Sequence, residues 1–169
     1  MKGTEVLADG YGRVREAVHE TVEGLTAEEL NARVDPAANS IAWLVWHLTR
    51  IQDDHVADAA GWEQVWEAQG WMERLALSLP AGATGYGHNA TQAGAVRIRS
   101  GEALLEYHDA VHEQSLRFLR GLAAADLDRV IDTRWDPPVT LGVRLVSVVS
   151  DDLQHAGQAA YVRGLLERR

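Results

Sequence analysis

Four long stretches of the chain carry apolar residues at helical spacing, and this periodicity limits the possible folds more than any other feature. Residues suited to capping helices stand at the ends of these stretches. We expect the four helices from about Glu5 to Leu25, from Asn39 or Ser40 to Ala60, from Ser100 to Gly121, and from Thr140 almost to Arg169. No alternating apolar pattern indicates a sheet, so the sequence predicts an all-α fold, a four-helix bundle.

The connections between these helices differ in length. A short one holds Thr26–Glu29, a capping-box pattern that opens a brief helix before Pro36. The longest covers residues 61–100, and it is rich in tryptophan at first and in glycine later. A connection this long between two helices is typical of a crossover or a functional lid. We expect it to cross between the second and third helices of a single domain that spans residues 1–169.

The charge of the chain argues against several classes of partner. A formal net charge of −9 is unsuited to nucleic acid or an anionic membrane, because both attract basic surfaces. No apolar run is long enough to span a bilayer, and the N-terminal residues lack the apolar core of a signal peptide. We therefore expect a cytoplasmic protein. The chain has no cysteine, which excludes disulfides, cysteine-zinc sites and a cysteine nucleophile.

Polar residues interrupt two of the apolar helical faces. His47 is in line with Leu44 and Leu48, while Asp151 and His155 stand one i,i+4 step apart in the fourth helix. An unpaired buried charge is costly, so such residues are normally solvated, paired or bound to a metal. Histidine and aspartate are both good ligands of zinc and nickel. One ligand from the second helix and two from the fourth would make a divalent-metal site with an open position, as catalytic sites have.

Spacing alone leaves other interpretations open. His47 by itself fits a core histidine held by a hydrogen bond, and the acids fit a partly solvated face. His108 and His112 in the third helix offer a rival i,i+4 pair. Asp152 competes with Asp151 for the role of carboxylate ligand. Because the two acids point about 100° apart around the helix, we expect Asp152 to face a second polar partner or solvent.

Three segments together resemble a known family. They are Asn39–Gly61 with "WLVWHL", Thr84–His88 with "TGYGH", and Arg134–Leu166 with "DDLQHAGQAAYVRG". In this order they resemble the DinB-like superfamily, and within it the actinobacterial branch of mycothiol S-transferases. Members of this superfamily are four-helix bundles, often dimeric, that hold a divalent metal between helices with three side chains. The resemblance extends over nearly the whole chain and implies the same fold.

The resemblance also implies which residues hold the metal. The family's last ligand immediately precedes an xGQ motif, which is "HAGQ" in this chain and points to His155. The ligand from the second helix corresponds to His47. Four residues before His155 the family usually has His or Glu, whereas this chain has Asp151, whose carboxylate has a shorter reach. No ligand of the family corresponds to His108 or His112, which become pocket or packing residues.

A reaction and a cofactor follow from the same resemblance. A zinc or nickel ion, with mycothiol as co-substrate, would support transfer of this low-molecular-weight thiol to a small electrophile. A chain without cysteine suits an external thiol, because it has no thiol of its own to form mixed disulfides. A metal-dependent hydrolase of the same bundle type and a non-catalytic metal-binding stress-response protein are the alternatives, since all three need the same ligands.

Four further residues are candidates for substrate binding. Arg144 lies seven residues before Asp151, and Arg50 lies one turn after the histidine of the second helix, so both can face the metal and grip a carboxylate. A surface ion pair with nearby acids is the plainer interpretation of Arg50. In the glycine-rich loop, Tyr86 and His88 can form a lip over the site, or they can belong to a simple turn.

Tryptophan is concentrated in one part of the chain. Five of the six tryptophans lie between positions 43 and 71. Most of them fit the core and the edge of the bundle, but one small core does not comfortably bury all five. Some should therefore cover an interface, and we expect a homodimer.

Overall fold

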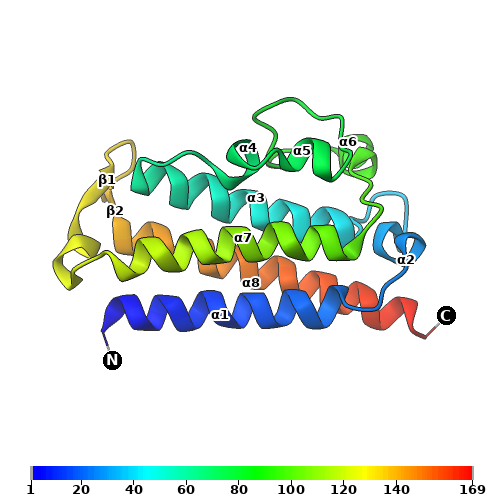
Figure 1. Cartoon of the computed structure of the whole chain (residues 1–169), viewed down its shortest axis with the longest axis horizontal. Helices are drawn as coiled ribbons and strands as arrows, with labels where there is room; N and C mark the ends of the chain where they lie inside the picture. Colours follow the sequence, from blue (N-terminus) through cyan, green and yellow to red (C-terminus); the bar gives the residue numbers. More distant parts are fainter. Residues whose placement is uncertain (1, 169) are drawn as a thin grey trace.

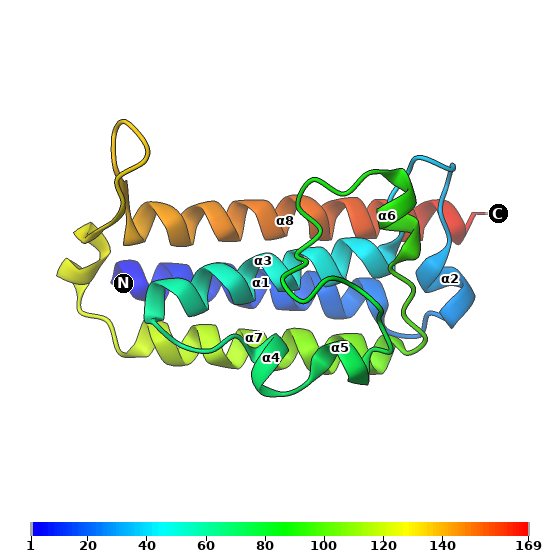
Figure 2. The same ribbon diagram turned by 90° about the horizontal axis from the view of Figure 1, so that it is seen from above.

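The computed structural model describes residues 2–168, and within that part of the chain the predicted helical bundle is confirmed (Figure 1). Its four long helices are α1 (Gly3–Val22), α3 (Ile41–Ala60), α7 (Gly101–Arg120) and α8 (Leu141–Leu166). Helix α1 packs against α7 and α8, and α3 packs against the same two helices. Figures 1 and 2 show that α1 and α8 run in one direction and α3 and α7 in the other. Each long helix therefore has one parallel and one antiparallel neighbour.

The predicted capping residues explain where the long helices begin and end. The hydroxyl groups of Ser40, Ser100 and Thr140 each accept a hydrogen bond from the backbone N–H of the third following residue. This contact satisfies one of the backbone donors that a helix start leaves unpaired. Of the two candidates for the start of α3, Ser40 is the cap and Asn39 is not. Gly61 ends α3 in the left-handed conformation, with φ of 67°, which glycine adopts without steric cost.

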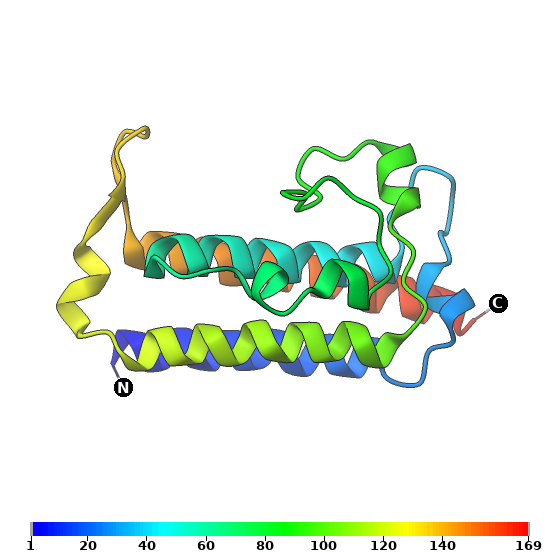
Figure 3. The same cartoon turned by 45° about the horizontal axis from the view of Figure 1, so that its top comes forward.

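The two connections before α7 differ as expected. Thr26 and Glu29 form the predicted capping box at the start of the brief helix α2 (Ala27–Asn31). Residues 61–100 contain the short helices α4 (Val65–Ala68), α5 (Trp71–Arg74) and α6 (Ala90–Ala95). This crossover lies along the outside of the bundle, and α4 contacts both α3 and α7 (Figure 3). Its length allows α7 to start at the same end of the bundle as α3, so the two helices run parallel.

One element was not predicted. After the 3-10 turn η1 (Ala124–Asp128), strands β1 (Val130–Asp132) and β2 (Val139–Thr140) pair antiparallel, with Asp132 opposite Val139. The sequence indicated no strand because these two have three and two residues, too few to show an alternating pattern. The hairpin stands at the end of the bundle where α8 begins (Figure 1).

The apolar face of α1 is buried in the core. In α1, Leu7, Val14, Val18 and Val22 are buried, but Val6 is 55% exposed because it lies one position off the apolar face. Across residues 2–168, no helix is long and apolar enough to cross a membrane.

Four of the five tryptophans between positions 43 and 71 are buried within a single chain. Trp43, Trp46, Trp66 and Trp71 are at most 6% exposed, and Trp62 is 39% exposed. The four buried rings pack where the crossover covers α3, so its short helices give the small bundle extra interior, while Trp62 packs on Phe118 of α7. The number of tryptophans was therefore a wrong reason to expect an interface, and the homodimer stays a prediction.

Candidate metal centre

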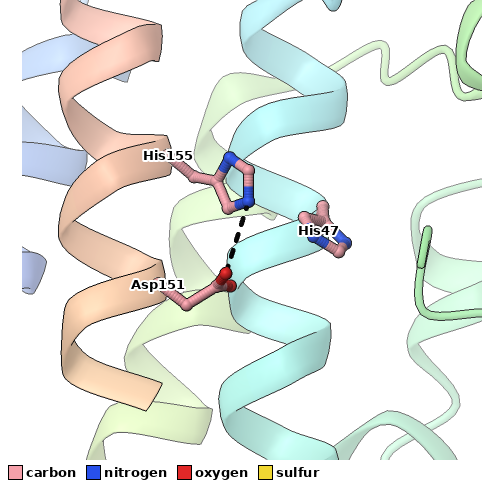
Figure 4. A group of neighbouring side chains, drawn as sticks. All are labelled: His47, Asp151 and His155. Carbon is pink, nitrogen blue, oxygen red and sulfur yellow. Dashed lines mark ion pairs between the residues drawn. The ribbon is translucent and has the colours of Figure 1, made fainter. Parts of the chain in front are cut away.

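Three side chains from two helices come together where α3 and α8 lie side by side (Figure 4). His47 projects from α3, and Asp151 and His155 project from neighbouring turns of α8. One ligand atom of each residue lies within 4.8 Å of those of the other two, and His155 Nε2 is 3.7 Å from an Asp151 carboxylate oxygen. Packing of α3 against α8 creates this convergence, which brings together the three residues that the sequence pattern selected.

The glycine-rich loop fixes the orientation of His47. Its Nδ1 donates a hydrogen bond to the carbonyl oxygen of Thr84 over 2.6 Å, so in the neutral ring Nε2 carries a free lone pair. The ring also stacks on Trp43, with centroids 4.6 Å apart and planes 18° apart. Burial lowers the pKa of His47, which keeps the ring neutral at physiological pH. A neutral, oriented imidazole is the form that binds a metal ion.

Gly85 makes this close approach of the loop possible. Its φ is +89°, a backbone conformation that other residues rarely adopt. A Cβ atom at this position would lie 2.7 Å from His47 Nδ1 and 3.2 Å from the Trp43 ring. The loop can therefore cover the histidine only because residue 85 has no side chain.

A glutamine positions the second histidine. His155 Nδ1 donates to the side-chain oxygen of Gln158 over 3.0 Å, which leaves Nε2 directed towards Asp151. Gln158 is the last residue of the "HAGQ" motif, so the motif contains both a candidate ligand and the residue that orients it. Outer contacts of this kind are general at metal-bound histidines.

The three side chains fit a divalent cation. Two imidazole nitrogens and a carboxylate oxygen are a donor set that zinc and other first-row metals accept. Oδ2 of Asp151 is buried and has no hydrogen-bond partner among residues 2–168, an arrangement that a cation would relieve. Two neutral histidines and one carboxylate carry a charge of −1, which leaves part of the charge of a divalent ion for an external ligand. Three protein ligands also leave at least one position open.

A cavity of about 420 Å³ opens beside this group. Its walls include the ligands His47 and Asp151 and residues from α3, the crossover, the hairpin and α8. The other lining residues are Ile51, His55, Tyr86, Asp132, Arg134, Trp135, Val139, Val143, Arg144, Ser147 and Val148. The candidate metal centre is therefore accessible to a small molecule.

Arg144 faces this cavity, as the sequence suggested. Its guanidinium donates to Asp132 over 3.2 Å and to Nδ1 of His55 over 3.0 Å. Arg134 makes two hydrogen bonds to the same Asp132, of 3.0 and 2.8 Å. The Arg134 side chain, with its backbone N–H, holds the pKa of Asp132 well below its usual range, with Arg144 acting in the same direction. Burial and the neighbouring Arg144 lower the pKa of His55, which favours its neutral form.

The structure does not place Arg50 at the mouth of the site, so that expectation is wrong. Arg50 is 1% exposed and its cation lies 4.8 Å from the ring of Trp66. It donates to the Ala83 carbonyl oxygen and to Gln64, and lies 3.6 Å from Asp53. The ion pair with an acid on the same helix was the plainer interpretation, but the pair is buried. Arg50 joins the crossover to α3, which is a structural role.

The two loop candidates occupy different positions. Tyr86 is 87% exposed and lines the cavity, so it can form part of a lip. His88 accepts a hydrogen bond from the indole N–H of Trp43 over 3.2 Å and stacks on Trp46. It does not line the cavity and acts on the site through Trp43, which stacks on His47. Asn89 then caps α6, as the simple-turn interpretation required.

Asp152 does not have the polar partner or the solvent exposure that its direction on the helix suggested. It is 0% exposed, and neither carboxylate oxygen has a hydrogen-bond partner within residues 2–168. Burial raises the pKa of Asp152 well above its usual range, so the folded protein favours the protonated acid. The expectation was wrong because the side of α8 next to Asp151 faces the interior of the bundle.

The rival histidine pair lies apart from the site. His108 and His112 are buried in α7 and stack with ring centroids 6.5 Å apart. Among residues 2–168, they belong to no cluster whose geometry could hold a metal. They pack in the core.

Several residues of the site were not found from the sequence. The spacing along the sequence does indicate Gln158, because a residue three positions after His155 can reach its ring on the same helix. The sequence gives no signal for Asp132 and Trp135, because their place beside the cavity depends on the position of the hairpin. It gives none for His55 either, because the contact of His55 with Arg144 depends on how α3 packs against α8. Thr84 contributes a carbonyl oxygen, which every residue has.

Comparisons with known proteins agree with this architecture. Residues 11–159 match the family model of the DinB superfamily. The chain is similar to a conserved protein from Enterococcus faecalis whose crystal structure is known, with 32% sequence identity and a TM-score of 0.93. That similarity covers 100% of this chain and 99% of the other. No curated protein matches the chain. The match over most of the sequence establishes that the chain belongs to the DinB superfamily.

Proposed function

We propose that this protein is a divalent-metal-dependent S-transferase that joins a low-molecular-weight thiol to a small electrophile. The observation that carries the proposal is that His47, Asp151 and His155 converge beside a cavity of about 420 Å³. The cavity is large enough for a small substrate. The chain has no cysteine, so a thiol nucleophile must come from a co-substrate. The resemblance to mycothiol S-transferases supports mycothiol in this role, with zinc or nickel as the metal.

The residues of the site have separate tasks. When bound, a divalent ion supplies positive charge that favours the thiolate form of a thiol, whose pKa is about 8.5 in water. The carbonyl of Thr84 and the amide of Gln158 hold the two histidines in place. Ile51, Val143 and Val148 form an apolar wall of the cavity, against which the carbon atoms of a substrate can lie.

The test begins with protein freed of metal by a chelator and reloaded with zinc or nickel. Mycothiol and chlorodinitrobenzene are then added, and formation of the thioether with release of chloride is followed by absorbance. We expect His47→Ala and His155→Ala to lose both metal and activity, and Asp151→Asn to bind metal more weakly. His108→Ala and His112→Ala are the controls, and both should keep the metal.

The outcomes separate the alternatives. Bound metal without any thioether would refute the transferase and leave a metal-binding stress-response protein. Hydrolysis of model esters or amides under the same conditions would indicate the hydrolase instead. Metal that survives His47→Ala but is lost on His108→Ala would place the ion at His108 and His112 instead.

A further inference from the structure

The cavity beside the candidate metal centre has two chemically different ends. His47 and Asp151 line one end, and Arg144 lies seven residues before Asp151 on α8. Seven residues make nearly two full turns, so the two side chains share a face and are separated by about 10 Å along the helix. A molecule that fills the cavity therefore contacts the metal ligands with one end and Arg144 with the other.

Two arginines and a single acid line the arginine end of the cavity. The guanidinium groups of Arg144 and Arg134 share a single carboxylate, that of Asp132. The other side chain that Arg144 contacts is His55, in which burial lowers the pKa and favours the neutral ring. Two guanidinium groups and one carboxylate therefore line this end of the cavity, while the acids Asp54 and Asp58, which act on His55 and Arg134, lie outside the lining. Arg144 is 19% exposed, so water screens its charge only partly.

The walls between the two ends are apolar and aromatic. Ile51, Val143 and Val148 line the cavity, and two exposed aromatic rings stand at its edge. They are Trp135, on the hairpin and 65% exposed, and Tyr86, on the crossover and 87% exposed. Exposed aromatic rings at a cavity are suited to cover the apolar body of a ligand.

We propose that the cavity takes a small amphipathic carboxylate, whose carboxylate binds Arg144 while its apolar body lies against Trp135 and its reacting end reaches the metal ligands. Two of the five N–H groups of the Arg144 guanidinium have recorded acceptors, and the carboxylate accepts from the others. Arg134 also pairs with Asp132. Asp132 therefore neutralises less of the positive charge of Arg144, and Arg144 binds the carboxylate of the ligand more strongly. This inference rests on the proposed function, because it assigns the substrate class of the same site.

The experiment measures binding, by titration calorimetry, of two probes that differ in one group. They are 6-mercaptohexanoate and 6-mercaptohexanol, each added to the zinc-loaded protein. A charge-assisted hydrogen bond contributes enough for roughly a tenfold preference, so we expect the carboxylate to bind at least about tenfold more tightly than the alcohol. Hexanoate, which has no thiol, is added to both zinc-loaded and zinc-free protein to test the carboxylate end alone.

Three variants test the role of the arginines. Arg144→Gln should abolish the preference for the carboxylate without changing the affinity for the alcohol. Arg134→Gln should reduce the preference severalfold, and because this side chain is 83% exposed, the variant does not depend on tolerance of a buried change. Arg99→Gln is the control, since this exposed arginine lies outside the cavity and its loss changes the net charge equally.

The results distinguish this inference from the proposed function. An equal affinity of the wild-type protein for both thiol probes, or a preference unchanged in Arg144→Gln and Arg134→Gln, would overturn the carboxylate site. If neither thiol probe binds but hexanoate binds and loses affinity in Arg144→Gln, the thiol proposal fails and the carboxylate site stands.

Discussion

Replacing His108 with leucine should stabilise the protein, and the gain should grow as the pH falls. His108 is 0% exposed, and neither ring nitrogen has a hydrogen-bond partner within residues 2–168. Burial lowers its pKa from 6.5 to about 3, with neighbouring His112 acting in the same direction. Leucine has a similar volume and no polar atoms, so it removes unpaired nitrogens without opening a cavity.

The magnitude follows from the two pKa values of His108. In the unfolded chain the ring takes up a proton below pH 6.5, whereas in the folded protein it stays neutral down to about pH 3. Between these values the unfolded state binds one more proton, so the stability of the folded state falls as the pH falls. The slope is about 1.4 kcal/mol per pH unit, which gives a loss of about 2 kcal/mol between pH ~7.5 and pH ~5. The unpaired ring nitrogens cost about 1–3 kcal/mol at every pH.

Urea unfolding followed by tryptophan fluorescence provides the measurement. Both proteins are kept free of metal with a chelator, because metal binding has its own pH dependence. All other titrating groups are common to the two proteins, so their difference isolates His108. The variant should gain about 2 kcal/mol more at pH ~5 than at pH ~7.5. The same pH dependence in both proteins would refute the reasoning, since His108 would then be free to take up a proton in the folded state.

Three further predictions concern the site and the assembly. Gln158→Leu should weaken zinc binding about 10–100-fold, measured by competition with a chromophoric chelator, and an unchanged affinity would exclude an orienting role. Gly85→Ala should also weaken zinc binding, because the new Cβ would lie 2.7 Å from His47 Nδ1. Gly87→Ala is its control, since φ there is also positive, at +74°, but no atom lies within 4 Å. Sedimentation at micromolar concentration should give twice the chain mass of 18.6 kDa, as a homodimer requires, and the mass of a single chain would contradict this expectation.

The sequence by itself determined the helices and the residues that limit them. Ser40, Gly61 and Thr140 act within one turn of chain, so their effect is local and readable from spacing. The same holds for Asp151 and His155, which stand one turn apart on any helix. The hairpin could not be predicted in this way, because strands of three and two residues are too short to show an alternating pattern of apolar residues.

Tertiary structure decided which of the predicted faces meet. Asp151 and Asp152 are neighbours of identical chemistry, yet one lines a cavity and the other is fully buried, because the packing of α8 against α1 and α3 sets the direction of each. Arg50 and Arg144 were both candidates to face the metal, but only Arg144 lines the cavity, since the crossover closes over Arg50. Such contacts join residues far apart in the chain, and they depend on how whole helices pack, which the pattern along a single helix does not contain.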